Sequence, residues 1–284
     1  METQKIKAIL SAVKHKSLSK AAEEVSYTPS AMSHIADAVE RELGVKILAR
    51  TPLGVTLTKE GEELYPHMTA LIRAERALLQ AASTLTEAKE YHLRIGTFSS
   101  ISQNILPEII GDFRRAHPEV RISMAVEDNL QDWLENGQAD VIFTDELTFG
   151  KGEWVPIKED PYVAVVSTEM LRGRRSVERE ELYGYTYIST SEKVLDDYFD
   201  RKRFAEVLEF ESVDNVSVLY MVQEGLGISV LPSLMVSGRI RGVKALKLEP
   251  PISRTIGFAF KKDAVLTHAA KIFIDYLKGE RGEA

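Results

Sequence analysis

Apolar residues recur at helical spacing through the N-terminal part of the chain. One face of residues 6–13 carries Ile6, Ile9, Leu10 and Val13, which predicts a first helix. A second helix is expected to begin at Ser19, and its small alanines would let another helix approach closely. Only a few residues separate this second helix from a third one that follows, and this spacing is typical of a helix-turn-helix.

A third helix is predicted from its two ends. Thr28 suits the N-cap, Pro29 suits the first helical position, and Gly44 supplies the C-terminal cap after Leu43. Residues 45–48 and 55–57 are short apolar stretches on either side of a Pro/Gly turn at 51–54. Such a pair of stretches predicts a β-wing. The N-terminal domain is therefore expected to be an all-α winged helix-turn-helix.

Residues 59–89 show a seven-residue apolar period and almost no turn formers. Leucine recurs at Leu64, Leu71, Leu78 and Leu85, and the position four residues further on is occupied by Met68, Glu75 and Ala82. This stripe predicts a long helix that pairs with another helix. Glu75 interrupts the stripe, and Pro66 should kink or offset the first turns. An amphipathic helix packed on its own chain is the alternative.

The remaining two-thirds of the chain alternates between strands and helices. Strands are expected at 91–96, 120–126, 139–144, 161–166, 185–188, 208–210, 228–232 and 256–260, and helices at 105–113, 215–224 and 266–277. Such alternation predicts βαβ units in an α/β domain with a mainly parallel sheet. The stretch from Pro161 begins a second, similar lobe. Ligands of open α/β sheets bind beyond the carboxyl ends of the strands.

Polar residues gather at these strand ends and are the candidate ligand contacts. They are Ser99, Ser100, Ser102, Asn129, Thr144, Ser189, Thr190 and Asn215. Residues 99–102 also open a helix, whose free N–H groups would attract a carboxylate. Asp128, Asp145, Glu146 and Asp214 lie near the same ends, and if they face the cleft a cationic or zwitterionic ligand is favoured. The alternative is that the hydroxyls only cap helices and the carboxylates are solvated.

Composition excludes several classes of protein. The chain has no cysteine, which excludes disulfides and zinc–thiolate sites, and its six histidines show no metal-ligand spacing. No HExxH, P-loop or G-x-S-x-G motif occurs, so neither an enzyme nor a bound cofactor or metal is expected. No long uncharged apolar run is present, and the start METQKIKAIL lacks a signal peptide's apolar stretch. These features predict a cytoplasmic protein with no membrane contact.

Charge is distributed unevenly along the chain. Residues 1–60 carry nine Lys/Arg against seven Asp/Glu, whereas the rest carries 27 against 36. A slightly basic N-terminal domain on an acidic body is compatible with DNA contact confined to that domain.

Several N-terminal motifs agree in order and spacing with one family. The segments at 17–25 (SLSKAAEEV), 31–33 (AMS), 40–44 (ERELG) and 55–61 (VTLTKEG), together with Arg50, resemble the head of the LysR-type transcriptional regulators. Further on, 225–232 (GLGISVLP) and 137–141 (GQADV) resemble the family's effector domain, two α/β lobes like those of periplasmic solute-binding proteins. The resemblance covers nearly the whole chain.

This resemblance implies a domain plan. Residues 1–60 would form the DNA-binding domain, 61–89 a dimerising linker helix, and 90–284 the effector-binding domain. Lobe I would comprise about 90–161 and 263–284, and lobe II about 162–262. Chain crossings near Pro161 and Lys262 would form a hinge, with the ligand between the lobes.

The resemblance also indicates which residues meet DNA. They are Thr28, Pro29, Ser30, Ser33, His34 and Arg50. Family members often carry Gln in place of Pro29, Arg in place of His34, and a basic residue in place of Leu53. Bidentate base contacts are thus lacking at two positions, and DNA shape should carry more of the specificity. Alternatively, Arg50 pairs with Glu42, Ser33 only stabilises its helix, and His34 is only solvated.

The function implied is a sequence-specific regulator that binds double-stranded DNA and is modulated by a small molecule. An amino-acid-like effector and a carboxylate both remain open. The linker helix implies a homodimer, and the family implies a homotetramer. A regulator of the same fold that acts constitutively is the main alternative. A solute-binding protein would explain the two lobes but not residues 1–89.

Overall fold

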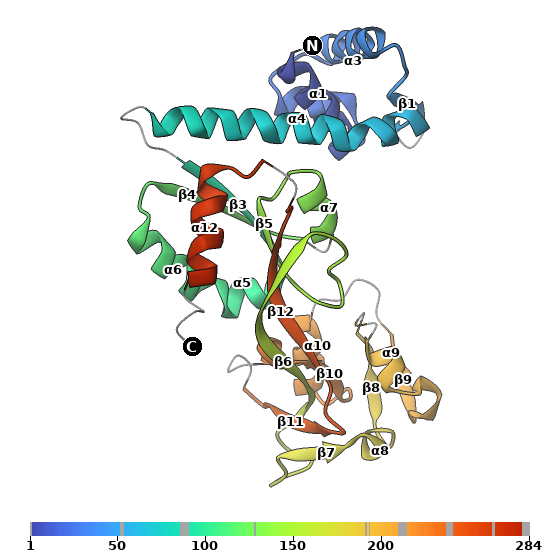
Figure 1. Ribbon diagram of the computed structural model, residues 1–284. Helices are drawn as coiled ribbons and strands as arrows, with labels where there is room; N and C mark the ends of the chain where they lie inside the picture. Colours follow the sequence, from blue (N-terminus) through green and yellow to red (C-terminus); the bar gives the residue numbers. More distant parts are fainter. Residues whose placement is uncertain are drawn as a thin grey trace.

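The fold comprises a helical head, one long helix and a two-lobed body (Figure 1). It is a computed structural model. It describes residues 2–51, 54–85, 91–127, 129–190, 192, 194–209, 215–236, 241–262 and 265–279. Leu53, Asp128, Asp214 and the expected end of the linker helix at 89 lie outside these residues. Within these ranges, no helix combines the length and the apolar character that a membrane span requires.

Three helices form the head: α1 (Thr3–His15), α2 (Leu18–Glu24) and α3 (Pro29–Leu43). The expected caps of α3 are confirmed, because the Thr28 side chain accepts from the Ala31 N–H and Gly44 ends the helix with φ +76°. The expected start of α2 at Ser19 was wrong by one residue, since the helix begins at Leu18 and Ser17 caps it by accepting from the Lys20 N–H. The helix-turn-helix consists of α2 and α3, which only a short turn separates.

The wing consists of β1 (Leu48–Thr51) and β2 (Gly54–Leu57), which pair antiparallel. The first strand begins three residues later than expected because α3 engages the backbone before it. The buried Glu40 carboxylate accepts from the N–H groups of Ile47 (2.9 Å) and Leu48 (3.0 Å). Gly54 has φ +115°, and a Cβ there would lie 2.2 Å from the Lys16 carbonyl oxygen. The wing can therefore pack against the end of α1 only because position 54 is glycine.

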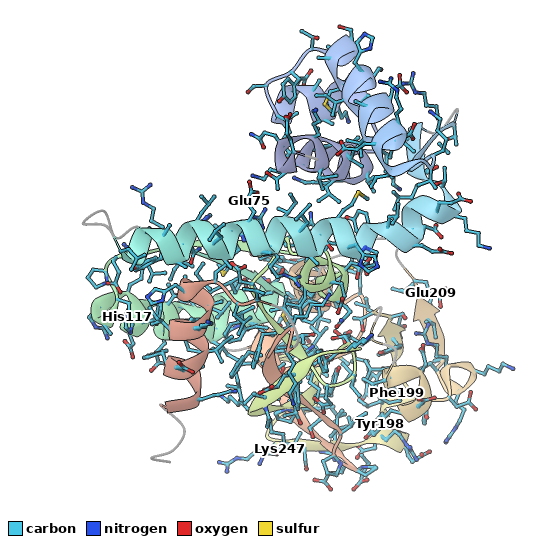
Figure 2. All side chains as sticks on the ribbon, turned by 45° about the horizontal axis from the view of Figure 1, so that its top comes forward. Glu75, His117, Tyr198, Phe199, Glu209 and Lys247 are labelled. Carbon is cyan, nitrogen blue, oxygen red and sulfur yellow. The ribbon has the colours of Figure 1, made fainter. Side chains whose placement is uncertain are left out.

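The long helix α4 (Lys59–Thr84) continues through Pro66 and divides its apolar stripe between two environments. In the first half, Met68 is buried in the core of the head, and Leu64 and Leu71 pack against this core and are half-buried. Glu75 lies on the face of α4 toward the head (Figure 2), accepts a hydrogen bond from Thr3 Oγ1 (2.7 Å) and forms an ion pair with Lys7 Nζ (2.7 Å). Glu75, the residue that interrupts the apolar stripe, therefore attaches α1 to α4.

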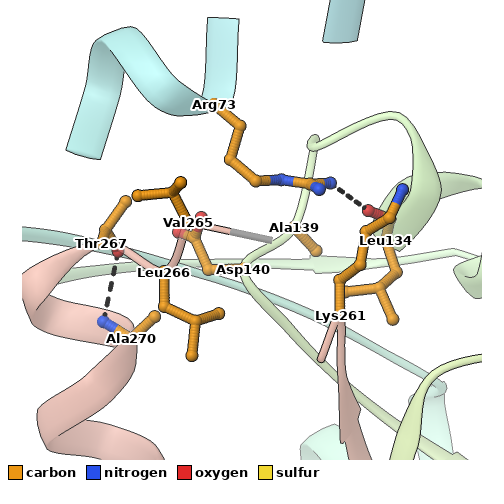
Figure 3. A pocket seen from close by; sticks show the side chains of 9 residues that line it. All are labelled: Arg73, Leu134, Ala139, Asp140, Lys261, Val265, Leu266, Thr267 and Ala270. Atoms are coloured by element: carbon orange, nitrogen blue, oxygen red, sulfur yellow. Dashed lines mark hydrogen bonds between the residues drawn. The ribbon is translucent and has the colours of Figure 1, made fainter. Parts of the chain in front are cut away.

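The opposite face of α4 is attached to the body by hydrogen bonds to main-chain carbonyls. Arg73 donates to Leu134 (2.7 Å, Figure 3), Arg76 to Gly137 (2.8 Å), and Gln80 to His92 (2.9 Å). Toward the end of α4, large apolar side chains are exposed at Leu78 and Leu79 and at the C-cap, Leu85.

Lobe I contains the expected parallel strands. They are β3 (Tyr91–Thr97), β4 (Val120–Val126) and β5 (Val141–Asp145), in the order β4-β3-β5. Its helices are α5 (Ser99–Asn104), α6 (Leu106–Ala116), α7 (Leu130–Glu135) and α12 (His268–Gly279). The core between sheet and helices is rich in phenylalanine, including Phe113, Phe143, Phe258 and Phe273.

One strand, β6 (Glu153–Ser167), runs through both lobes and is far longer than expected. Its residues 153–161 pair with β12 (Ser253–Phe260), and its residues 162–167 pair with β10 (Ser229–Pro232) and β11 (Val243–Glu249). These pairings are antiparallel, so the expectation of a mainly parallel sheet was wrong for the strands around β6 and β12. In lobe II, by contrast, β7 (Ser176–Glu178) pairs parallel with β11, and β8 (Thr186–Ile188) pairs parallel with β9 (Glu206–Leu208). β12 also pairs with β5 and completes lobe I. The second crossing therefore falls just before Ser253, not near Lys262.

Lobe II extends the β6–β11 sheet with one short strand, β7, and adds further short elements around it. They are β7 (Ser176–Glu178), α8 (Arg179–Leu182), β8 (Thr186–Ile188), α9 (Val194–Tyr198), η1 (Arg201–Arg203), β9 (Glu206–Leu208), α10 (Asn215–Gln223) and α11 (Ser233–Val236). An aromatic cluster of Tyr183, Tyr187, Phe199 and Phe204 holds one face together.

Candidate functional site

The predicted DNA contacts lie on the N-terminal half of α3 and on the wing. Thr28, Pro29, Ser30 and His34 are exposed, and Ser33 is half-buried. The hydroxyls of Thr28 and Ser30 are 3.1 Å apart at the start of the helix. α3 lies at the end of the head away from the body (Figure 1). The free N-terminus of a helix with exposed hydroxyls suits contact with base edges and phosphates.

Arg50 is separated from these residues in sequence but belongs to the same domain. It is exposed on β1, opposite Val55 of β2. A guanidinium on a wing can reach a phosphate beside the groove that a recognition helix enters. The six predicted contacts thus occupy one helix and the adjacent hairpin.

The junction between the two lobes contains a buried ion cluster centred on Arg254 of β12. Only 4% of Arg254 is exposed. Its guanidinium lies 3.0 Å from Asp160 and 3.3 Å from Asp145, and donates to the Ser100 hydroxyl at 3.3 Å. Burial by itself lowers the pKa of this guanidinium, but the nearby negative charges outweigh burial and raise it. Arg254 is therefore a fixed positive charge between the lobes.

Asp160 connects this cluster to lobe II. Its carboxylate also accepts from Ser233 Oγ (2.8 Å) and the Leu234 N–H (3.0 Å) at the start of α11. Close by, the Tyr162 hydroxyl donates to Glu192 at 2.9 Å, and burial raises the pKa of this phenol. β6, β12, α5 and α11 thus meet at one point where charge is concentrated.

Of the lobe I residues predicted to touch a ligand, two lie at this point. Ser100 contacts Arg254, and the buried Thr144 precedes Asp145 and bonds the Thr148 hydroxyl at 2.8 Å. The others have local roles as well: Ser102 donates to the Ser99 carbonyl (2.9 Å), Ser99 is exposed, and Asn129 caps α7.

The three predicted residues of lobe II lie at the ends of its elements. Ser189 and Thr190 follow β8, and Asn215 is the first residue of α10; all three are half-buried. The Ser189 N–H donates to the Leu208 carbonyl at 2.9 Å.

Several charged residues of the junction were missed by sequence reasoning. Arg254, Asp160 and Glu192 were not predicted, whereas Asp145 was considered and is buried at 3% exposure. Glu146, also considered, is exposed and accepts from the Thr255 N–H. Arg254 and Asp160 each stand beside a strongly apolar strand segment. A charged residue in such a place is expected to be buried and paired, and this was the signal that could have identified both residues. In the described part of the chain, no group of three or more potential metal ligands occurs.

Two family models match the chain and together span almost all of it. Residues 3–62 match the bacterial regulatory helix-turn-helix protein, lysR family, and residues 86–282 match the LysR substrate binding domain. The chain belongs to the LysR family. It is a LysR-type transcriptional regulator with a helix-turn-helix DNA-binding domain and an effector-binding domain.

Individual relatives agree with this assignment over their full length. The HTH-type transcriptional regulator YvbU of Bacillus subtilis (strain 168) is 24% identical over 98% of both chains. Full-length OxyR from Pseudomonas aeruginosa shares the fold with a TM-score of 0.74 at 20% identity, covering 98% of this LysR-family chain and 95% of OxyR. The regulatory domain of Synechocystis CcmR, solved with 2-PG, has a TM-score of 0.59 at 19% identity and covers 67% of this chain and 97% of that domain.

Proposed function

We propose that this LysR-type regulator binds specific double-stranded DNA through α3 and the wing, and that a small molecule between the lobes modulates this binding. The observation that carries the proposal is the exposed N-terminal half of α3, with Thr28, Pro29, Ser30 and His34 accessible on a head that α4 joins to a two-lobed body. The proposed role is regulatory rather than catalytic, in the cytoplasm.

A glutamate at Ser30 tests the DNA interface. Ser30 occupies the first turn of α3, where a carboxylate interacts favourably with the helix dipole, so the head should stay folded. Facing phosphates, the same carboxylate should weaken binding by roughly 100-fold or more, because like charges at an interface cost several kcal/mol. Fluorescence anisotropy with duplexes from the DNA flanking the encoding gene measures the effect.

The matched control is Ser123→Glu, at an exposed serine of β4 in lobe I. It adds the same charge and should leave DNA affinity unchanged. Wild-type binding should fall steeply with salt and exceed binding to random DNA. Equal affinity of wild type and Ser30→Glu, or no preference over random DNA, would refute the proposed interface.

For the effector, we favour an amino-acid-like ligand that carries an ammonium group. Among the residues that the structure describes, Asp145, Asp160 and Glu192 supply three carboxylates at the junction, beside the guanidinium of Arg254. This excess of negative charge attracts a cationic group of a ligand and repels an anionic one. The start of α5 would meet the ligand's carboxylate.

A thermal-shift screen of amino acids, amines and carboxylates tests this effector site. A ligand of the folded state raises the melting temperature by mass action, and amino acids or amines should do so. The shift should shrink in Thr190→Val and persist in Thr168→Val, a matched change at an exposed turn of lobe II. No shift across the screen would favour a constitutive regulator, and shifts from carboxylates alone would overturn the amino-acid-like class.

We further propose that the second half of α4 pairs two chains. Leu78 and Leu79 of α4 and Leu85, its C-cap, are 69%, 61% and 87% exposed, and large apolar side chains gathered on a surface in this way mark an interaction site. Burying them against a second α4 would place two heads on paired half-sites. A homotetramer through the effector-binding domains is the larger assembly that we expect.

A further inference from the structure

A cavity of about 250 Å³ lies where the head, α4 and lobe I meet. It is distinct from the junction between the lobes, because its walls come from α1, the end of α2, α4 and the turn after α7. One wall is largely apolar and consists of Leu10, Val25, Tyr65 and Ile72. The cavity is of a size that suits a small organic molecule rather than only a few waters.

The remaining wall is basic. Lys7, Lys14 and Arg76 line the cavity, and the two lysines are paired with Glu75 and Glu24, each at 2.7 Å. Three cations therefore face two carboxylates, which leaves one positive charge uncompensated.

Arg76 carries that charge. Its only hydrogen bond in the described ranges goes from one terminal nitrogen to the Gly137 carbonyl, and no described carboxylate lies within ion-pair distance of it. Burial, and next the positive charge of Arg94, lowers the pKa of the Arg76 guanidinium to about 10 and outweighs the opposing charges of Asp140 and Glu75, which do not pair with it directly. None of its nitrogens is buried without a partner, so its uncommitted donors remain accessible.

We propose that this cavity binds an organic anion, namely a carboxylate carried on an apolar or aromatic body. The guanidinium presents parallel donors that match the two oxygens of a carboxylate. The apolar wall favours an anion with an apolar body over inorganic phosphate, which has none. The body of the ligand would pack against the apolar wall. Because the walls belong to the head, the linker helix and lobe I, the bound anion would hold the DNA-binding domain in one position on the body.

Calorimetric titration of the full-length protein with 3-phenylpropionate, and with its neutral amide, tests the proposal. The acid should bind and the amide should bind at least about ten-fold more weakly, because only the acid compensates Arg76. Arg76→Gln should lower the affinity for the acid to that of wild type for the amide. Gln138→Trp should abolish binding of the acid and of the amide, because the larger side chain on the half-buried turn after α7 would fill the cavity.

Arg114→Gln, at an exposed arginine of α6, is the matched control and should bind the acid as wild type does. Unfolding curves of each variant establish that it is folded, and Gln138→Trp keeps the test decisive should Arg76→Gln not fold. Absence of binding by the acid overturns the proposal. Binding that persists in both Arg76→Gln and Gln138→Trp also overturns it, because the acid would then occupy another site.

Discussion

Replacing Arg254 with methionine is expected to destabilise the protein by about 3–5 kcal/mol, because it leaves Asp145 and Asp160 buried without their counter-charge. Methionine keeps much of the side chain's volume, so the loss should reflect charge rather than a cavity. Urea unfolding followed by circular dichroism measures it.

Two variants sharpen this test. Adding Asp160→Asn to Arg254→Met removes one of the stranded charges while an amide oxygen can still accept from Ser233 and Leu234, so part of the stability should return. Arg114→Met, at an exposed arginine, should stay within about 0.5 kcal/mol of wild type. A small effect of Arg254→Met, comparable to that of Arg114→Met, would mean that the cluster does not stabilise the junction between the lobes.

The double variant Leu78→Glu with Leu85→Glu should dissociate the proposed oligomer and weaken the association of its chains by at least about 100-fold. Each leucine buried between two chains contributes roughly 1.5–3 kcal/mol to the free energy of association, and glutamate removes this contribution. Both side chains are exposed in the single chain, so the fold itself should be unaffected. Sedimentation equilibrium gives the mass, and anisotropy on a two-half-site duplex should show weaker binding.

The control for this change is Leu147→Glu. Leu147 is 54% exposed in the turn after β5 of lobe I and is not part of α4, so this variant should keep the wild-type mass. If the double variant has the same mass as wild type, the exposed leucines of α4 are not the interface between chains.

Much of the head could be predicted because its signals are local. Thr28, Pro29 and Gly44 act on backbone groups within a few residues, and the structure confirms all three. The wing strand was misplaced because Glu40 competes for the backbone of 47–48 through contacts that helix and strand patterns do not encode. Family membership was likewise predictable, since it rests on ordered short motifs, and the family models confirm it.

The stripe of α4 shows the limit of periodicity. The same seven-residue spacing describes Met68, buried in the head, and Leu85, 87% exposed. A period states that one face is apolar but does not state which surface covers it. Only the position of the head along the helix decides this, and it also explains Glu75, which meets Thr3 and Lys7 of α1.

By itself, the sequence determined the helix-turn-helix, the two-lobed α/β body and the exposed face of α3, because caps, periods and motifs act over short distances. Tertiary structure alone decided the rest. It brings Arg254 to Asp145 and Asp160 across 109 and 94 residues, moves the second crossing from Lys262 to a point before Ser253, and opens the cavity beside Arg76. Contacts between residues so far apart depend on how whole strands and helices pack, which no local pattern specifies.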